Sequence, residues 1–129
     1  MKNTSITLLL TIAAIATACS SQKTQVATSP LTGKWQLTKT LADMGDGKAK
    51  WTFVDKDSVL ITDLKNDGSI AGNAMPGTTK YTITDSAHLA VTIEHNAEPI
   101  DYRYKIEEDT LELNPPCREA CGMRFVRIK

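Results

Sequence analysis

The sequence predicts an all-β fold, a small antiparallel up-and-down barrel of about eight strands. From Leu31 to the end of the chain, apolar residues recur at every second position, as on the buried face of a strand. Turn-forming residues such as Asn66-Asp67-Gly68 and Asp85-Ser86 separate these apolar runs. No stretch has a convincing helical period. The residues before Leu31 follow a different pattern.

Residues 1–18 have the features of an export signal. Lys2 gives the N-terminus a positive charge, and the run from Ile6 to Ala16 is apolar except for Thr7 and Thr11. The run is too short to cross a bilayer as a permanent helix, so it predicts a cleaved signal peptide.

The end of this segment, Ala16-Thr17-Ala18-Cys19, resembles the lipobox of bacterial lipoproteins, with Ala16 where Leu is usual. The resemblance implies that Cys19 becomes the mature N-terminus and carries fatty acyl chains such as palmitate. The protein would then be anchored to a membrane of the bacterial cell envelope, facing the periplasm or the exterior. The alternative is ordinary signal-peptide cleavage after Ala18, which leaves Cys19 as a free thiol.

The cysteine count agrees with lipidation. Three cysteines in an exported protein leave one unpaired, and acylation of Cys19 accounts for it. Cys117 and Cys121 then remain as a pair, and a disulfide between them requires a turn, for which Pro115-Pro116 and Gly122 are suitable residues. The competing interpretation is half of a metal site, but no His or third Cys lies nearby to complete one. We expect a disulfide and no metal.

Residues 19–30 are predicted to form a flexible tether. The segment is polar and has almost no apolar periodicity, so burial cannot offset the entropy lost on ordering it. Fully extended, it would reach about 35 Å from the membrane surface. Residues 31–129 remain for a single domain with one core.

The strands of this domain are predicted from their alternating apolar residues. Trp35 and Leu37 share a face of the first, and Trp51 and Phe53 share a face of the next. The others are predicted around Val59 and Ile61 (with Leu60 on the opposite face), Tyr81 and Ile83, Leu89 to Ile93, Ile100 to Ile106, Leu111 and Leu113, and Met123 to Ile128. A meander of such strands removes its exposed edges by closing into a barrel.

Gly33-x-Trp35, at the start of a small exported chain of short strands, resembles the calycin group, and specifically the lipocalin-like lipoproteins of bacteria. The segment from Tyr104 to Leu113 resembles the penultimate hairpin of those domains. The resemblance implies that Trp35 plugs one barrel end beneath an arginine of the last strand, Arg127 or else Arg124. The META type of exported β-domain is the nearest rival, but its Gly-Cys-Asn signature is missing.

The sequence contains no recognisable catalytic constellation, and we expect no enzyme activity and no cofactor. His88 and His95 lie an odd number of residues apart and so point to opposite faces of a strand. The segment from Asp63 to Ile70 resembles a calcium loop but has Lys65 at a ligand position, so a hairpin turn is expected. Asp43 and Asp46 are expected in a solvated loop.

Two functions remain, and neither involves nucleic acid, because 15 Lys and Arg balance 15 Asp and Glu. In the first, the barrel mouth binds a small apolar or amphipathic ligand. Its lining would be aromatic, formed by Trp51, Phe53, Tyr81, Tyr102 and Tyr104. In the second, the barrel is filled by its own side chains, and the protein acts in the envelope as an inhibitor or assembly factor through its loops. We expect a monomer in either case.

Overall fold

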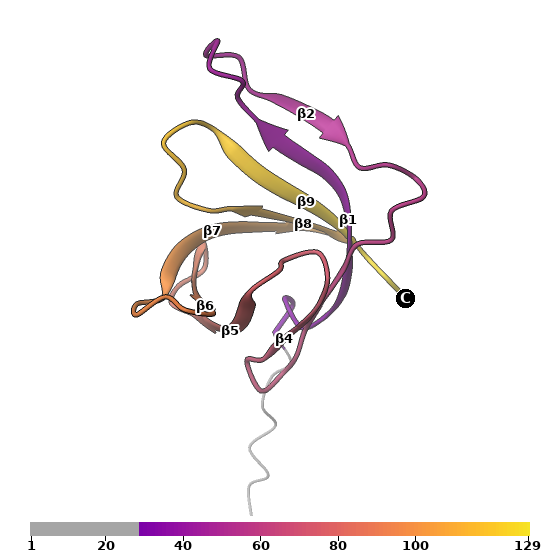
Figure 1. The fold of residues 1–129 in the computed structure, drawn as a ribbon. Helices are drawn as coiled ribbons and strands as arrows, with labels where there is room; N and C mark the ends of the chain where they lie inside the picture. Colours follow the sequence, from indigo (N-terminus) through magenta and orange to yellow (C-terminus); the bar gives the residue numbers. More distant parts are fainter. Residues whose placement is uncertain (1–28) are drawn as a thin grey trace, which may run out of the picture.

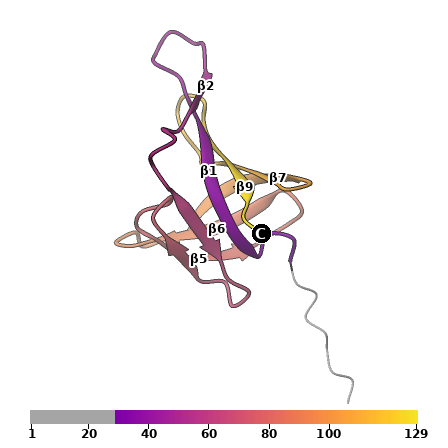
Figure 2. The same cartoon turned by 90° about the vertical axis from the view of Figure 1, so that its right-hand side faces the viewer.

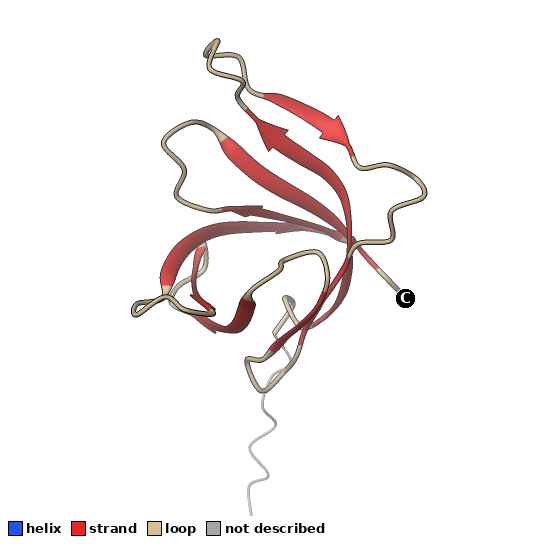
Figure 3. Cartoon of the chain, in the orientation of Figure 1, coloured by secondary structure: helices blue, strands red, loops and turns tan. Residues whose placement is uncertain are grey.

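The described part of the chain, residues 29–129 of a computed structural model, consists of nine strands (Figure 1). The signal peptide, Cys19 and most of the tether lie outside the described residues, so the predictions made for them stay predictions. Figure 3 shows loops joining the strands and no helix in the described part. The strands are β1 (Gly33–Ala42), β2 (Lys50–Phe53), β3 (Ile61–Leu64), β4 (Ile70–Gly72), β5 (Thr78–Ile83), β6 (His88–Ile93), β7 (Ile100–Glu107), β8 (Thr110–Asn114) and β9 (Cys121–Arg127).

Eight of these strands form a nearly closed antiparallel barrel. They are paired in the order β4-β3-β1-β9-β8-β7-β6-β5. The two end strands are joined by an isolated bridge between Ser69 and Lys80 rather than by a full ladder. The amide of Tyr81 also donates a hydrogen bond to the carbonyl of Gly68, over 2.8 Å. The predicted all-β, up-and-down barrel is therefore confirmed.

β1 pairs with three strands. It pairs with β9 along one edge and with β3 and then β2 along the other. Its first half, Gly33 to Gln36, pairs with β3, and its second half, Lys39 to Ala42, pairs with β2. A register shift between Leu37 and Lys39 separates the halves on the side of β9. Such bulges bend a strand and increase its twist.

Residues 39–53, the second half of β1 with β2 and the connection between them, form what we call the hairpin projection. Figures 1 and 2 both show it at the end of the molecule opposite to the first described residues. Asp43 closes its tip by accepting hydrogen bonds from the amides of Gly45 and Gly47. Asp46 accepts another from the amide of Lys48.

The buried apolar side chains of the described residues pack together as one core cluster. Trp35 and Phe125 are the largest side chains with no exposed surface. The buried apolar residues come from both ends of the chain and from every barrel strand except β4: Leu31, Trp35, Leu37, Leu64, Ala74, Met75, Tyr81, Leu89, Val91, Tyr102, Leu111, Leu113 and Phe125. Burial of this set is the main driving force for folding.

The third strand differs from the prediction. It begins at Ile61, and the side chain of Val59 is 59% exposed. The preceding residues form a turn, in which the amide of Ser58 donates to the carbonyl of Asp55. This turn interrupts pairing with β1 and leaves Thr62 and Leu64, not Ile61, on the buried face.

β4 is a strand that the alternation of apolar residues does not predict. Its three residues continue the hairpin after the turn at Asn66-Asp67-Gly68, which is where a turn was expected. Asn73 then ends the strand: its side chain accepts a hydrogen bond from the amide of Ile61 and donates one to the carbonyl of Val59. So short a strand has too few alternating positions to give a period-two signal.

Candidate functional site

Trp35 and Arg127 meet at the end of the barrel where the described chain begins. They are direct partners in the β1–β9 ladder, and the guanidinium carbon of Arg127 lies 4.1 Å from the centre of the Trp35 ring. The indole nitrogen donates to the carbonyl of Leu31 over 2.8 Å. Arg127 donates to the carbonyls of Pro30 and Thr32, so the last residue of the expected tether contacts the domain. That this contact closes the barrel remains a prediction.

Gly33 lies directly beside this pair. Its φ of 137° is rarely adopted by residues with side chains. A β-carbon at Gly33 would also lie 2.8 Å from Nη1 of Arg127. Glycine at this position therefore allows the guanidinium to approach the strand and to lie over the indole.

The five aromatic residues predicted to line a ligand site lie in different environments. Tyr81 and Tyr102 are core residues, and Tyr81 donates its hydroxyl to the carbonyl of Lys65. Burial raises the pKa of Tyr102. Tyr104 is half-buried and donates to the carbonyl of Asp85. Trp51 and Phe53 belong to β2, which pairs with β1 but is not one of the eight barrel strands.

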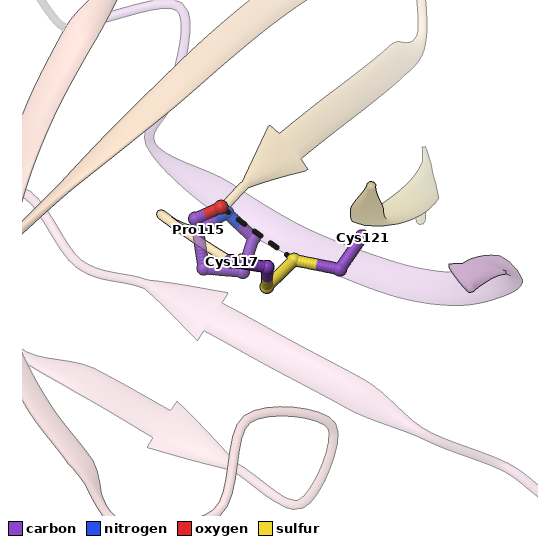
Figure 4. Close-up of a disulfide and its surroundings, with 3 residues drawn as sticks. All are labelled: Pro115, Cys117 and Cys121. Carbon is purple, nitrogen blue, oxygen red and sulfur yellow. Dashed lines mark hydrogen bonds between the residues drawn. A yellow bond between two sulfur atoms is a disulfide. The ribbon is translucent and has the colours of Figure 1, made fainter. Parts of the chain in front are cut away.

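Cys117 and Cys121 form the predicted disulfide, with their α-carbons 6.0 Å apart (Figure 4). The bridge lies in the connection between β8 and β9. Pro115 contributes to the turn, because its carbonyl accepts a hydrogen bond from the amide of Cys117, and the sulfur of Cys121 lies 3.5 Å from the same oxygen. The bridge closes a short loop at the start of β9, next to the strand residue Gly122.

The remaining polar candidates form local contacts. The carboxylate of Asp67 accepts hydrogen bonds from the hydroxyl and the amide of Ser69, and its pKa is lowered chiefly by the hydroxyl and next by the amide. The pKa of Asp85 is lowered chiefly by the amide of Ala87 and next by the His88 ring. His95 lies in the turn after β6, where its ring is 90% exposed. Within residues 29–129, no group of three His, Cys, Asp or Glu residues is arranged to hold a metal.

The outer surface of the sheet has a continuous row of paired residues from β7 to β2. Neighbours in this row are direct ladder partners, in the order Lys105, Glu112, Arg124, Lys39 and Phe53. Arg124 binds the carboxylate of Glu112 at 2.9 Å. The Nζ atom of Lys39 lies 4.4 Å from the centre of the Phe53 ring. Successive partners in a ladder point to the same face, so these side chains form one surface.

Trp51 lies beside this row. The guanidinium carbon of Arg124 is 4.2 Å from the centre of the Trp51 ring. The ring rests against Gly122, where an added β-carbon would lie 3.3 Å from its Cη2 atom. The Trp51 ring thus packs against the sheet because Arg124 contacts it and because Gly122 has no side chain to displace it. Phe53, two residues on, is 75% exposed.

Three surface hollows accompany these features. The largest, of about 770 Å³, is polar and lies on β7, β8 and β9, between Lys105, Glu107, Glu112 and Arg124. A second, of about 360 Å³, adjoins the disulfide, and a third, of about 320 Å³, lies under Phe53 and Val54. Of the buried core residues, only Leu37 lines any of the three.

β2 is an edge strand. Within the described residues it pairs only with β1. The amide of Val54 donates to the carbonyl of Thr38, so the backbone of Val54 faces β1. Backbone direction alternates along an antiparallel strand, so Thr52 also faces β1 and the amides and carbonyls of Trp51 and Phe53 face away from it.

No family model matches the chain, and no curated protein or solved structure matches it significantly. The described residues also include no apolar helix of the length that crossing a bilayer requires.

The sequence predicts Trp51 and Phe53 as lining residues of a ligand site at the barrel mouth, and the structure shows both on β2, beside the eight barrel strands. The sequence does not identify Lys39, Glu112 or Arg124 as their neighbours. The available signal was the alternation of charged with apolar residues in β1, β8 and β9. Alternation predicts that these charges are exposed, but only the strand register shows which of them are adjacent.

Proposed function

We propose that this protein is a lipid-anchored lipoprotein of the bacterial cell envelope, and that its lipocalin-like domain acts by binding another macromolecule through the hairpin projection. The lipobox-like Ala16-Thr17-Ala18-Cys19 supports the anchor. The nearly closed antiparallel barrel and the contact of Trp35 with Arg127 support the lipocalin-like assignment. The proposed role is non-catalytic.

One observation favours binding of a macromolecule over transport of a small apolar ligand. The inward side chains pack as one core cluster, whereas Phe53 is 75% exposed on the projecting β2. Aromatic side chains and arginine are enriched at protein interfaces, and Arg124 contacts Trp51 two residues before Phe53. A carrier of apolar molecules would instead direct such side chains into a cavity.

The position of the projection agrees with this role. It lies at the end of the domain away from Ser29, the first described residue (Figures 1 and 2). The chain that leads from an anchor at Cys19 would join the domain at the Ser29 end. The projection would then point away from the membrane, where a partner can reach it.

A native mass spectrum of the protein purified from its own envelope tests the proposal. We expect the mass of the chain beginning at Cys19 with its acyl chains and no further bound small molecule. Denaturing the same sample gives the matched control, because covalent lipid stays attached and a bound ligand dissociates. A stoichiometric apolar ligand that is lost on denaturation would contradict the proposal in favour of a carrier.

A further inference from the structure

We propose that two copies of this chain associate through the free edge of β2, forming an antiparallel β2–β2 pair with its two-fold axis at Thr52. The inference deepens the proposed function, on which it rests, by naming a second copy as a partner of the hairpin projection. It departs from the monomer expected from the sequence, because the free edge of β2 is visible only in the fold.

The backbone geometry selects the register. The outward amides and carbonyls belong to Trp51 and Phe53, since Val54 and Thr52 face β1. A two-fold axis at Thr52 places Trp51 of one copy opposite Phe53 of the other. Both pairs then exchange N–H···O bonds, so all the outward groups of these two residues find partners.

The side chains fit the same register. Trp51 and Phe53 point to one face of β2, so Phe53 of one copy would lie on that face beside Trp51 of the other, whose ring leans toward β9. Aromatic cross-strand pairs stabilise antiparallel sheets. Phe53, the most exposed aromatic residue of the described chain, would lose much of its exposure in this pairing.

Charge favours a second copy as the occupant. Without residues 1–18, which contain Lys2 and no other charged side chain, the chain has 14 Lys and Arg and 15 Asp and Glu, so two copies repel each other only weakly through net charge. In this register Lys50 lies opposite Val54 rather than opposite another lysine, although charged edge residues commonly prevent such pairing. The segment Trp51-Thr52-Phe53 is therefore complementary to itself about Thr52.

The pairing is short, so we expect it to be reversible and dependent on concentration. Copies anchored through Cys19 to one membrane would be held at similar heights. Tethering to a common surface raises the effective concentration of one projection near another. The association is therefore best measured in the intact envelope.

Cysteine cross-linking of the full-length protein in its own envelope tests the register. Thr52 is exposed and would face its own copy as a non-hydrogen-bonded pair, with α-carbons about 4.5 Å apart. That distance permits a disulfide. Lys50→Cys is the matched control, because it places an exposed cysteine on the same strand and face. Its two copies would lie about 13 Å apart, beyond the reach of a disulfide.

We expect Thr52→Cys to give at least about tenfold more covalent dimer than Lys50→Cys on non-reducing electrophoresis. In the proposed register only the two copies of residue 52 lie close enough for a disulfide. Adding Phe53→Lys to Thr52→Cys should reduce the dimer severalfold. Equal yields from the two single variants, no dimer from Thr52→Cys, no effect of Phe53→Lys, or a cross-link to a different protein would each overturn the proposal.

Membrane fractionation of the same cells measures the anchor separately. Wild-type protein in the soluble fraction would contradict the lipoprotein part of the proposed function. The comparison of Thr52→Cys with Lys50→Cys would still report the register. A retained apolar ligand in the native mass spectrum would contradict the macromolecule-binding role. The cross-linking comparison would still report the register of the β2–β2 pair.

Discussion

The guanidinium of Arg127 lies 4.1 Å from the centre of the Trp35 ring, at the first ladder position that joins the two terminal strands of the domain. β1 opens the domain and β9 ends it, so this contact connects residues 92 positions apart in the sequence. The indole is buried, and a desolvated cation–π contact is stronger than an exposed one.

Trp35 and Arg127 should therefore be energetically coupled. We expect Trp35→Phe and Arg127→Ala to be non-additive by about 1 kcal/mol in the free energy of unfolding. Denaturant titration of the two single variants and the double variant measures this coupling. Arg124→Ala is the control, because Arg124 contacts Trp51 instead and its effect should add to that of Trp35→Phe within about 0.5 kcal/mol. Additivity of both arginine variants would contradict the predicted closure role of Arg127.

Gly33→Ala should destabilise the domain by about 1–3 kcal/mol, because a β-carbon both strains the backbone and displaces Arg127. Gly45→Ala is a useful comparison. Gly45 also has positive φ, of 89°, but a β-carbon there meets no atom within 4 Å. We expect a smaller loss for Gly45→Ala, and Gly33→Ala should cost less in an Arg127→Ala background, where only the backbone strain remains. Equal losses in thermal unfolding would indicate that backbone conformation alone matters.

Thr62→Val should stabilise the domain by about 1 kcal/mol, because the hydroxyl of Thr62 is buried without a hydrogen-bond partner in the described chain. Valine has nearly the same shape and no polar atom. Thr38→Val is the matched control, since Thr38 donates its hydroxyl to the carbonyl of Arg124 and its loss should destabilise. Calorimetric unfolding distinguishes the two, and a loss of stability in Thr62→Val would refute the interpretation.

Neither Cys117 nor Cys121 should react in a thiol titration of the unfolded, unreduced protein, because the two are bonded to each other. Replacing both by alanine should lower stability by about 2 kcal/mol, the value expected for a loop this short. Cys121→Ala alone should leave one titratable thiol at Cys117. Two reactive thiols at these positions in protein from the oxidising envelope would contradict the bridge.

Cys19→Ala should move the protein from the membrane fraction to the soluble periplasm, because each buried methylene of an acyl chain contributes about 0.8 kcal/mol to membrane binding. Fractionation followed by immunoblotting measures the distribution. Ala16→Leu brings the segment closer to the usual lipobox and should leave the protein in the membrane. Retention of the Cys19→Ala protein in the membrane would show that the anchor lies elsewhere.

Much of the fold could be predicted from the sequence because it depends on short-range patterns. Period-two alternation in Ile100 to Ile106 and the turn at Asn66-Asp67-Gly68 are local consequences of side-chain direction and backbone preference. The Cys117–Cys121 bridge could be predicted for the same reason, since only four positions separate the two residues. Local chemistry thus determined the turn at Asn66-Asp67-Gly68, the disulfide and most of the strands, but not β4 or the start of β3.

Only the tertiary structure decided which faces and edges meet. After the register shift that follows Leu37, β1 pairs with β2, so Trp51 and Phe53 lie on a strand that is not one of the eight barrel strands. Register brings Arg124 between Glu112 and Lys39, residues far apart in the chain. Alternation shows that a residue is on the surface, but adjacency across strands depends on pairings that no local pattern encodes.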